Sequence, residues 1–166
     1  MRLTTMTDYA MRLLMYVAHQ NERLCTIAEI AAAYQISEAH LMKITHQLAQ
    51  GGFLETVRGK GGGMRLAQEP AAINLGAVVR YIESDFAVVE CFTGHNVCSL
   101  TGHCKLAGIL SGAMNSFLDH LDRHTLADVL QERVPTLRTV TLAPAVARKV
   151  KTPGTTGATS SKRARG

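Results

Sequence analysis

Apolar residues recur every three or four positions in three successive segments at the start of the chain, a spacing that predicts three helices. The first segment covers residues 7–20, with Thr7 in position to act as its N-cap. The second helix begins after Thr26 and ends at Gln35, and the third opens at Ser37. The positions expected to face the core are Tyr9, Leu13, Tyr16 and Val17 in the first helix, Ile27, Ile30, Ala31 and Tyr34 in the second, and Leu41, Ile44 and Leu48 in the third.

The pattern then changes from helix to a short hairpin. The glycine pair Gly51-Gly52 ends the third helix, and two strand-like runs follow at residues 53–57 and 64–66. The tip between the strands is rich in glycine and carries two cations, in the order Arg58-Gly59-Lys60-Gly61-Gly62-Gly63. Two helices joined by a short turn make a helix-turn-helix. We therefore expect a mainly α fold class, a winged helix-turn-helix whose wing is a small β-hairpin.

The next part of the chain is expected to hold a short helix, a cysteine-rich loop and a long helix. Pro70 marks a boundary, and residues 73–85 have one apolar face. Between Lys105 and Asp122, apolar residues recur along about five turns, at Leu106, Leu110, Ala113, Phe117 and Leu121. Because one small domain could hardly cover both ends of such a helix, we interpret it as a long dimerisation helix, with an ordinary core helix as the alternative. Thr125 and Asp128 form the pattern of a capping box, which starts a short final helix.

The net charge of +5 is concentrated at the C-terminal end. Seven Lys or Arg residues and no acid lie from Val134 onward, whereas residues 1–133 hold 11 basic and 13 acidic residues. The overall basicity therefore does not by itself indicate DNA binding. We divide the chain into a winged helix-turn-helix region at 1–70, the cysteine loop with the dimerisation helix at 71–134, and a basic tail at 135–166 that we expect to be disordered.

The sequence predicts a cytoplasmic protein that does not associate with a membrane. No segment approaches the roughly 18 apolar residues that a membrane span needs, and the N-terminus lacks the pattern of a secretory signal. In a reducing compartment, four cysteines favour metal binding or redox chemistry over structural disulfides. Three of them lie between Cys91 and Cys104, whereas Cys25 stands alone beside a helix start and is expected to be a small buried hydrophobe.

The three clustered cysteines, Cys91, Cys98 and Cys104, are candidate metal ligands. Their spacing differs from the Cys-x-x-Cys pairs of most structural zinc sites. Three soft thiolates on one loop suit an iron–sulfur cluster, which normally takes four protein ligands. Zinc fits as well, because His95 and His103 lie in the same loop and three cysteines with one histidine make an ordinary tetrahedral set. The spacing of the cysteines alone therefore does not distinguish a zinc site from an iron–sulfur cluster.

A helix-turn-helix reads DNA with residues near the start of its second helix, which enters the major groove. In a wing, glycines let the backbone approach DNA closely, and cations can enter a minor groove or clamp a phosphate. The alternative for the helix residues is an ordinary solvated surface. The alternative for the wing is a hairpin tip whose cations only keep it soluble. The candidate DNA-binding residues are Ser37, His40 and Lys43 in the helix and Arg58, Lys60 and Arg65 in the wing.

Several segments taken together resemble a known family, the winged-helix iron–sulfur transcriptional regulators. The resemblance runs from Met1 to about Leu130. Within the family, the chain is most similar to the nitric-oxide-sensing repressors. The segments that carry the resemblance are Met1-Arg2-Leu3-Thr4 with Thr7-Asp8-Tyr9-Ala10, His40-Leu41-Met42-Lys43, Val57-Arg58-Gly59-Lys60-Gly61-Gly62-Gly63 with Arg65-Leu66, Val89-Glu90-Cys91-Phe92, and Thr125-Leu126-Ala127-Asp128.

The resemblance implies that the three cysteines bind an iron–sulfur cluster, 4Fe-4S or alternatively 2Fe-2S. Its fourth ligand would be Asp8 from the other subunit of a homodimer, because Ala107 stands where the iron–sulfur assembly regulators of the family have a histidine. Without the family, Asp8 is only a first-turn carboxylate that favours the helix dipole. The implied function is a repressor of nitric-oxide detoxification genes. It would bind a double-stranded DNA operator and release it when nitric oxide attacks the cluster.

Two residues depart from the family pattern. Gln35 stands where relatives commonly have glycine, which costs about 1 kcal/mol if the position is left-handed. Ala39 stands where relatives often have asparagine, and alanine cannot make the bidentate contact of asparagine to adenine.

Three other functions compete with nitric-oxide sensing. They are an iron- or redox-responsive cluster regulator, a zinc-stabilised winged-helix regulator, and a small metalloenzyme or electron carrier. The sequence contains no nucleophile–base arrangement or phosphate-cradling motif, so we do not expect an enzyme.

Overall fold

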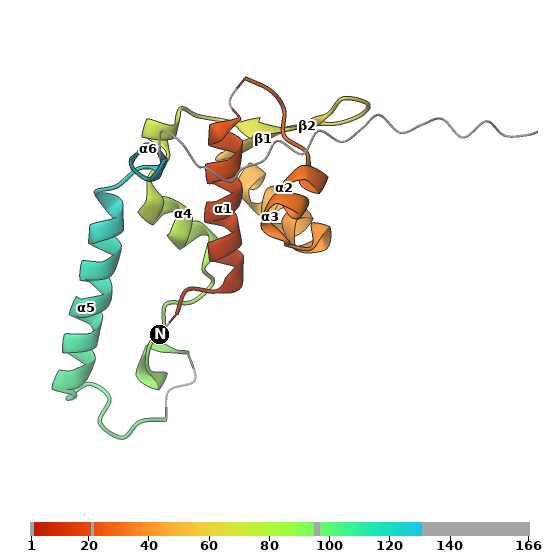
Figure 1. Cartoon of the computed structure of the whole chain (residues 1–166). Coiled ribbons are helices and arrows are strands. Elements are labelled where there is room, and N and C mark those ends of the chain that lie inside the picture. Colours follow the sequence, from red (N-terminus) through yellow and green to blue (C-terminus); the bar gives the residue numbers. More distant parts are fainter. Residues whose placement is uncertain (1, 21, 95–96, 131–166) are drawn as a thin grey trace, which may run out of the picture.

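The computed structural model of the chain describes residues 2–20, 22–94 and 97–130 (Figure 1). This part of the chain is mainly helical, with one two-stranded antiparallel sheet, as the sequence predicted. The elements in chain order are α1 (Thr5–His19), α2 (Ile27–Tyr34), α3 (Glu38–Gln50), β1 (Leu54–Val57), β2 (Gly63–Leu66), the 3-10 turn η1 (Pro70–Ala72), α4 (Leu75–Ile82), the 3-10 turn η2 (Glu90–Phe92), α5 (Lys105–Asp122) and α6 (Leu126–Val129).

Helix α1 begins earlier than the sequence pattern indicated. Thr7 lies inside the helix and is fully buried, and the N-cap is Thr4, whose hydroxyl accepts the Thr7 N–H at 3.4 Å. The backbone N–H of Thr4 donates in turn to Oε1 of Glu83 at 2.6 Å. The prediction of Thr7 as the N-cap was wrong because a carboxylate 79 residues away helps to fix the start of the helix. A local sequence pattern does not contain that information.

Helices α2 and α3 form the predicted helix-turn-helix. Both predicted N-caps are confirmed, because the hydroxyls of Thr26 and Ser37 accept the backbone N–H groups of Glu29 and His40. Gln35 is the C-cap of α2, and its φ of 56° and ψ of 39° lie in the left-handed region. This conformation ends α2 and turns the chain toward α3.

The wing is an antiparallel hairpin in which Val57 is opposite Gly63, and both predicted strands are confirmed. Gly62 in its tip has no room for a side chain, because a Cβ atom would collide with the carbonyl oxygen of Val57. Strand β2 is also attached to the segment before α2, because Met64 and Cys25, which precedes the N-cap Thr26, exchange backbone hydrogen bonds of 2.7 and 2.9 Å. The wing is therefore held against the helix-turn-helix.

One hydrophobic core is assembled around α1, which passes through the middle of the molecule (Figure 1). The predicted core positions Leu13, Tyr16 and Val17 are at most 2% exposed. Leu126 from α6 is fully buried in the same core. The other buried apolar residues of this core are Ala10, Leu14, Ala18, Cys25, Ile30, Ile36, Leu41, Ile44, Leu48, Phe53, Leu54, Met64, Ile73, Leu75, Val78 and Ile82.

Helix α4 is shorter than the predicted segment 73–85 and holds the end of α5. Arg80 and Asp122 form a bidentate ion pair with distances of 2.5 and 2.7 Å, and the guanidinium lowers the pKa of the Asp122 carboxyl. A Cβ atom on Gly76 would collide with that carboxylate, so the glycine permits the close approach of the two helices. Asn74, the N-cap of α4, also donates to the carbonyl oxygen of Asp122 at 2.6 Å.

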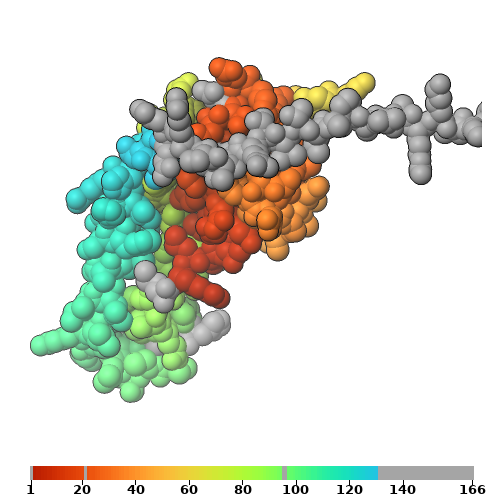
Figure 2. All heavy atoms as spheres, in the orientation of Figure 1, coloured from red at the N-terminus to blue at the C-terminus, as the bar shows by residue number. Residues whose placement is uncertain are grey.

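Helix α5 runs along one flank of the molecule (Figure 2). None of its 18 residues is buried. Leu106 of its predicted apolar stripe and the adjacent Ile109 are 59% and 69% exposed, whereas Leu110, Phe117 and Leu121 of the stripe are half-buried. The N-terminal half of α5 therefore presents large apolar side chains to solvent in a single chain.

The chain continues from α5 into the short helix α6. Its predicted capping box is confirmed, because Asp128 Oδ2 accepts the backbone N–H of Thr125 at 2.7 Å, a bond that lowers the pKa of Asp128. The predicted basic tail at 135–166 lies outside the described residues. Within the described residues, no helix is both long enough and apolar enough to pass through a lipid bilayer.

The left-handed Gln35 gives a prediction about stability. Replacing it with glycine should raise the free energy of unfolding by about 1 kcal/mol, because glycine adopts this conformation without the steric cost of a Cβ atom. Urea denaturation of the two proteins measures the change.

The matched control is Gln20→Gly at the C-cap of α1, where φ is −111° and glycine relieves no strain. That substitution should lower stability, because glycine loses more conformational entropy on folding. If Gln35→Gly also proved less stable than the parent, the strain assigned to the turn would be absent.

Candidate functional site

The three clustered cysteines line one pocket. Cys91 lies in the turn η2, Cys98 is in the loop that follows, and Cys104 is the N-cap of α5. The pocket has a volume of about 220 Å³. The other residues of its wall are mostly apolar, and they are Val89, Glu90, Leu100, Leu106, Ala107 and Leu110. The fold therefore brings the three cysteines that the sequence grouped to one cavity.

The pocket suits soft thiolate chemistry better than a hard cation site. Cys98 is exposed, whereas Cys91 and Cys104 are half-buried. Among the described residues, no three His, Cys, Asp or Glu side chains stand close enough together to hold a single metal ion. His103 is not one of the residues that line the pocket, and His95 lies outside the described residues. Three thiols in an apolar wall fit a cluster, whose thiolates bind different iron atoms.

Short-range hydrogen bonds shape the cysteine loop. The carbonyl oxygen of Cys98 accepts the hydroxyl of Thr101 at 2.7 Å and its backbone N–H at 3.2 Å, which makes a tight turn. The carbonyl oxygen of Glu90 accepts the hydroxyl of Thr93 at 2.8 Å, and its carboxylate accepts the N–H of Val97 at 3.3 Å. The backbone around Cys91 and Cys98 is therefore held by hydrogen bonds between neighbouring residues and not by packing in a hydrophobic core.

Asp8, the predicted fourth ligand, does not line the cysteine pocket of its own chain. It is in the first turn of α1, with a side chain about half exposed. Its two carboxylate oxygens pair with Nε and Nη2 of Arg12 at 3.1 and 3.0 Å. The sequence analysis missed this pair, although a spacing of four residues on a helix brings such side chains together. In a single chain, both carboxylate oxygens of Asp8 are therefore engaged in an ion pair with Arg12.

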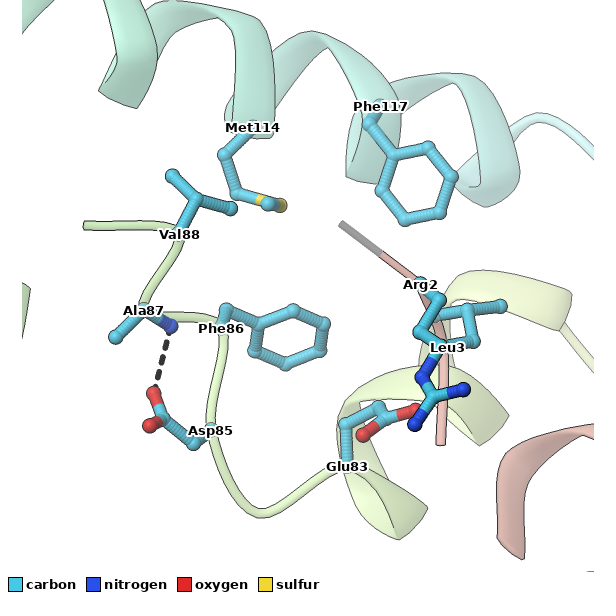
Figure 3. Close-up of a pocket in the computed structure, with 9 residues that line it drawn as sticks. All are labelled: Arg2, Leu3, Glu83, Asp85, Phe86, Ala87, Val88, Met114 and Phe117. Atoms are coloured by element: carbon cyan, nitrogen blue, oxygen red, sulfur yellow. Dashed lines mark hydrogen bonds between the residues drawn. The ribbon is translucent and has the colours of Figure 1, made fainter. Parts of the chain in front are cut away.

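A second cavity, of about 440 Å³, lies beside the path from α4 to the cysteines (Figure 3). Leu3 from the N-terminal segment, Phe86 and Val88 from the loop, and Met114 and Phe117 from α5 line it. The wall also contains the buried Glu83 that accepts the Thr4 N–H. The N-terminal segment, the approach to Cys91 and α5 therefore meet at one place.

Cys25 is separate from the cysteine pocket. Its side chain is fully buried in the main core, as the sequence predicted. Burial raises the pKa of its thiol to about 12, and the nearby carboxylate of Glu29 adds to the shift. Cys25 is therefore a structural residue, since a reactive cysteine needs a thiolate that solvent can reach.

The candidate DNA-reading residues on α3 are all exposed. Ser37 and His40 are partly committed to each other, because the Ser37 hydroxyl lies 3.0 Å from Nδ1 of His40. The His40 ring also packs near Tyr9 of α1, with ring centroids 6.2 Å apart, which leaves Nε2 as the ring nitrogen for a contact with DNA. Lys43 lies on the outer side of the helix, next to Met42, which the sequence analysis did not select and which is 55% exposed.

The wing presents three cations in different settings. Arg58 and Lys60 lie at the hairpin tip and are exposed. Arg65 lies on β2 opposite Glu55, and its guanidinium contacts that carboxylate at 2.8 Å. Glu55 offsets the charge of Arg65, so Arg58 and Lys60 are the stronger candidates for contact with phosphates.

A winged helix-turn-helix with exposed cations defines the class of this molecule as a DNA-binding transcriptional regulator. The chain belongs to the Rrf2 family, whose model is described as an iron-dependent transcriptional regulator and matches residues 3–132. The family and its curated members are regulators, so this chain is a transcriptional regulator and not an enzyme.

Individual relatives agree with the family match. The HTH-type transcriptional regulator NsrR of Geobacillus kaustophilus is 48% identical over 135 residues, which are 80% of this chain and 92% of that protein. The protein of the same name from Bacillus licheniformis is 44% identical over 135 residues, 80% of this chain and 94% of that protein. The solved structure of T. potens IscR matches with a TM-score of 0.61 and 26% identity, covering 77% of this chain and 85% of that one. The predicted resemblance and fold class are confirmed.

The contrast between Cys25 and the other cysteines predicts their reactivity. In the metal-free protein at pH 8, iodoacetamide should modify Cys91, Cys98 and Cys104 and leave Cys25 unmodified until the protein is denatured. Mass spectrometry of the intact chain should show three additions in the native protein and four in urea. Rapid native modification of Cys25, located by peptide mapping, would contradict its assignment to the core.

Proposed function

We propose that this regulator is a homodimeric repressor that binds a double-stranded DNA operator in the cytoplasm and releases it on exposure to nitric oxide. Release would derepress genes for nitric-oxide detoxification. The sensing group would be an iron–sulfur cluster, 4Fe-4S or alternatively 2Fe-2S, bound by Cys91, Cys98 and Cys104. The observation that carries the proposal is the pocket that these three cysteines share, in a chain whose curated relatives include several proteins named NsrR.

The pocket supplies three soft ligands and a mostly apolar wall. When bound, the cluster would supply iron at which nitric oxide can displace a protein ligand. Ala107 lines the same wall, so the position that resembles a histidine ligand of related regulators offers no donor atom here. Glu90 is the carboxylate in this wall, and it accepts the backbone N–H of Val97. Asp8 of the partner subunit is the candidate for the fourth ligand that the family resemblance supplies.

A dimer is the assembly in which Asp8 can reach a cysteine pocket that its own α1 does not line. The exposed apolar stripe on α5 supports such a dimer, because Leu106 and Ile109 need a partner to leave water. Both residues follow Cys104 within two turns, so the same helix would bring the partner subunit close to the pocket. A carboxylate is also a weaker partner for iron than a thiolate, which makes it the ligand that exchanges first.

The contacts around the start of α1 suggest how a change at the pocket would reach DNA. Asp8 and Thr4 lie in one turn of α1, and Thr4 is bonded to Glu83, which begins the segment that leads to Cys91. Through its core residues α1 packs on α3, the helix that carries Ser37, His40 and Lys43. A shift of the cysteine segment would therefore move α1 and, with it, the two recognition helices of the dimer. The half-site spacing that an operator requires would be lost.

Two related functions stay as alternatives, an iron- or redox-responsive cluster regulator and a zinc-stabilised regulator. The family description as iron-dependent favours the first over the second. Zinc would need His95 or His103 as its fourth ligand, and of these only His103 is described, outside the pocket wall.

The proposed sensor can be tested with protein purified without oxygen. We expect iron and inorganic sulfide in place of zinc, and a coloured visible spectrum. The probe for binding is a duplex that the intact protein selects from a randomised library. At one fixed salt concentration, nitric oxide should lower the affinity for this duplex at least tenfold, measured by fluorescence anisotropy. Stoichiometric zinc in a colourless protein would exclude the cluster, and unchanged affinity would exclude nitric oxide as the signal.

Asp8→Ala tests the proposed fourth ligand. The substitution should leave the fold intact, because the side chain is half exposed, and should make iron release to a chelator several-fold faster. Arg12→Ala is the matched control, because it breaks the same ion pair but keeps the carboxylate. Absorbance decay in the presence of the chelator measures both. Equal rates in Asp8→Ala and the parent protein would leave Asp8 as an ordinary first-turn acid.

A further inference from the structure

Met42 has an unusual position for a methionine in this chain. Its side chain is 55% exposed on α3, whereas Met64 is 2% exposed and Met6, Met11 and Met15 pack against the core. Among the described methionines it is the one whose side chain lies mainly in solvent. An exposed apolar residue is common on protein surfaces, so its exposure becomes informative only through its location.

That location is the outer face of the second helix of the helix-turn-helix. Met42 is the fifth residue of α3 and lies one turn after Glu38, so its side chain follows the N-terminal turn that enters the groove. Its neighbours in sequence mark the two sides of the helix, because Leu41 is fully buried and Lys43 is exposed. No other large apolar side chain of α3 is among the strongly exposed ones.

We propose that Met42 is a specificity-determining residue that contacts the C5-methyl group of one thymine in each half-site of the operator. This inference rests on the proposed function, since it requires a dimer that binds DNA. Among the four bases, thymine is the one that presents a methyl group in the major groove, and apolar side chains contact this group. A methionine side chain is long and flexible enough to cover a methyl group at the bottom of the groove.

The rest of the exposed face of α3 strengthens this assignment. Ala39, three residues before Met42, carries no group that could hydrogen-bond a base edge. Ser37 shares its hydroxyl with the backbone N–H and the ring of His40, so its capacity for a base contact is reduced. Lys43 next to Met42 supplies the charge that holds the helix against phosphates. His40 keeps Nε2 for a polar contact, and Met42 is the large apolar side chain that this face offers to a base.

Deoxyuridine tests the proposal, because it differs from thymidine only by the missing methyl group. The intact dimer, purified without oxygen, selects a duplex from a randomised library, and each thymine of that duplex is then replaced in turn by deoxyuridine. We expect one position per half-site at which the replacement weakens binding about fourfold, with no comparable loss elsewhere in the half-site. Replacing both symmetric positions should weaken binding about fifteenfold.

The same replacements are repeated with Met42→Ala and Met42→Leu. The alanine variant should bind the thymine and deoxyuridine duplexes equally, whereas leucine, which keeps an apolar surface of similar size, should retain most of the preference for thymine. Met42 is exposed, so both variants should fold, which circular dichroism checks. A preference for thymine that persists in Met42→Ala would overturn the assignment of Met42.

The two proposals fail in different ways. If the selection enriches no sequence, the proposed function fails and the role of Met42 fails with it. If an enriched duplex is bound and is released by nitric oxide, but no thymine is coupled to Met42, the proposed function stands and the present inference is wrong.

Discussion

The burial of α1 is the constraint on which the rest of the structure depends. Its core residues are at most a few per cent exposed, and the helix-turn-helix, the wing, α4 and α6 all bury apolar side chains in the same core. Each fully buried large apolar side chain is worth about 1.5–3 kcal/mol relative to an exposed one, so this core dominates stability. The N-cap of the same helix, Thr4, is bonded to Glu83, which begins the segment that leads to the cysteines. Because α1 both organises the core and packs on α3, it cannot shift without moving α3.

Most of the fold could be predicted from the sequence because it is encoded in local patterns. The buried residues Leu13, Leu41 and Leu48 follow from helical spacing, and the capping box at Thr125 follows from its side chains. The errors occurred where distant contacts decide. Helix α1 starts at Thr5 because its N-cap is bonded to Glu83, and α4 is shorter than its apolar pattern suggested. Neither the start of α1 nor the end of α4 can be predicted from the few residues around it.

The candidate site was predictable in part. Clustering in the sequence grouped Cys91, Cys98 and Cys104, and the fold brings them to the wall of one pocket, whereas their role as ligands stays a prediction. Spacing could not distinguish a cluster from zinc, because ligand geometry depends on how the loop folds. The ion pair between Asp8 and Arg12 was accessible from their spacing. The periodicity that buries Leu41 and Ile44 also places Met42 on the exposed face, but it does not show whether that position would meet DNA.

The position of Leu126 in the core has a consequence for how the protein is made. The core around α1 is complete only when this residue is in place, and the bond from Thr4 to Glu83 also joins distant parts of the chain. During synthesis, the N-terminal segment therefore cannot fold stably until nearly all of the structured part has left the ribosome. The entropy lost when this segment becomes ordered is offset only when the core is complete. The helix-turn-helix and the segment that leads to the cysteines are therefore completed in one folding event. A partly made or C-terminally shortened chain that lacks Leu126 would have an incomplete core and no finished helix-turn-helix.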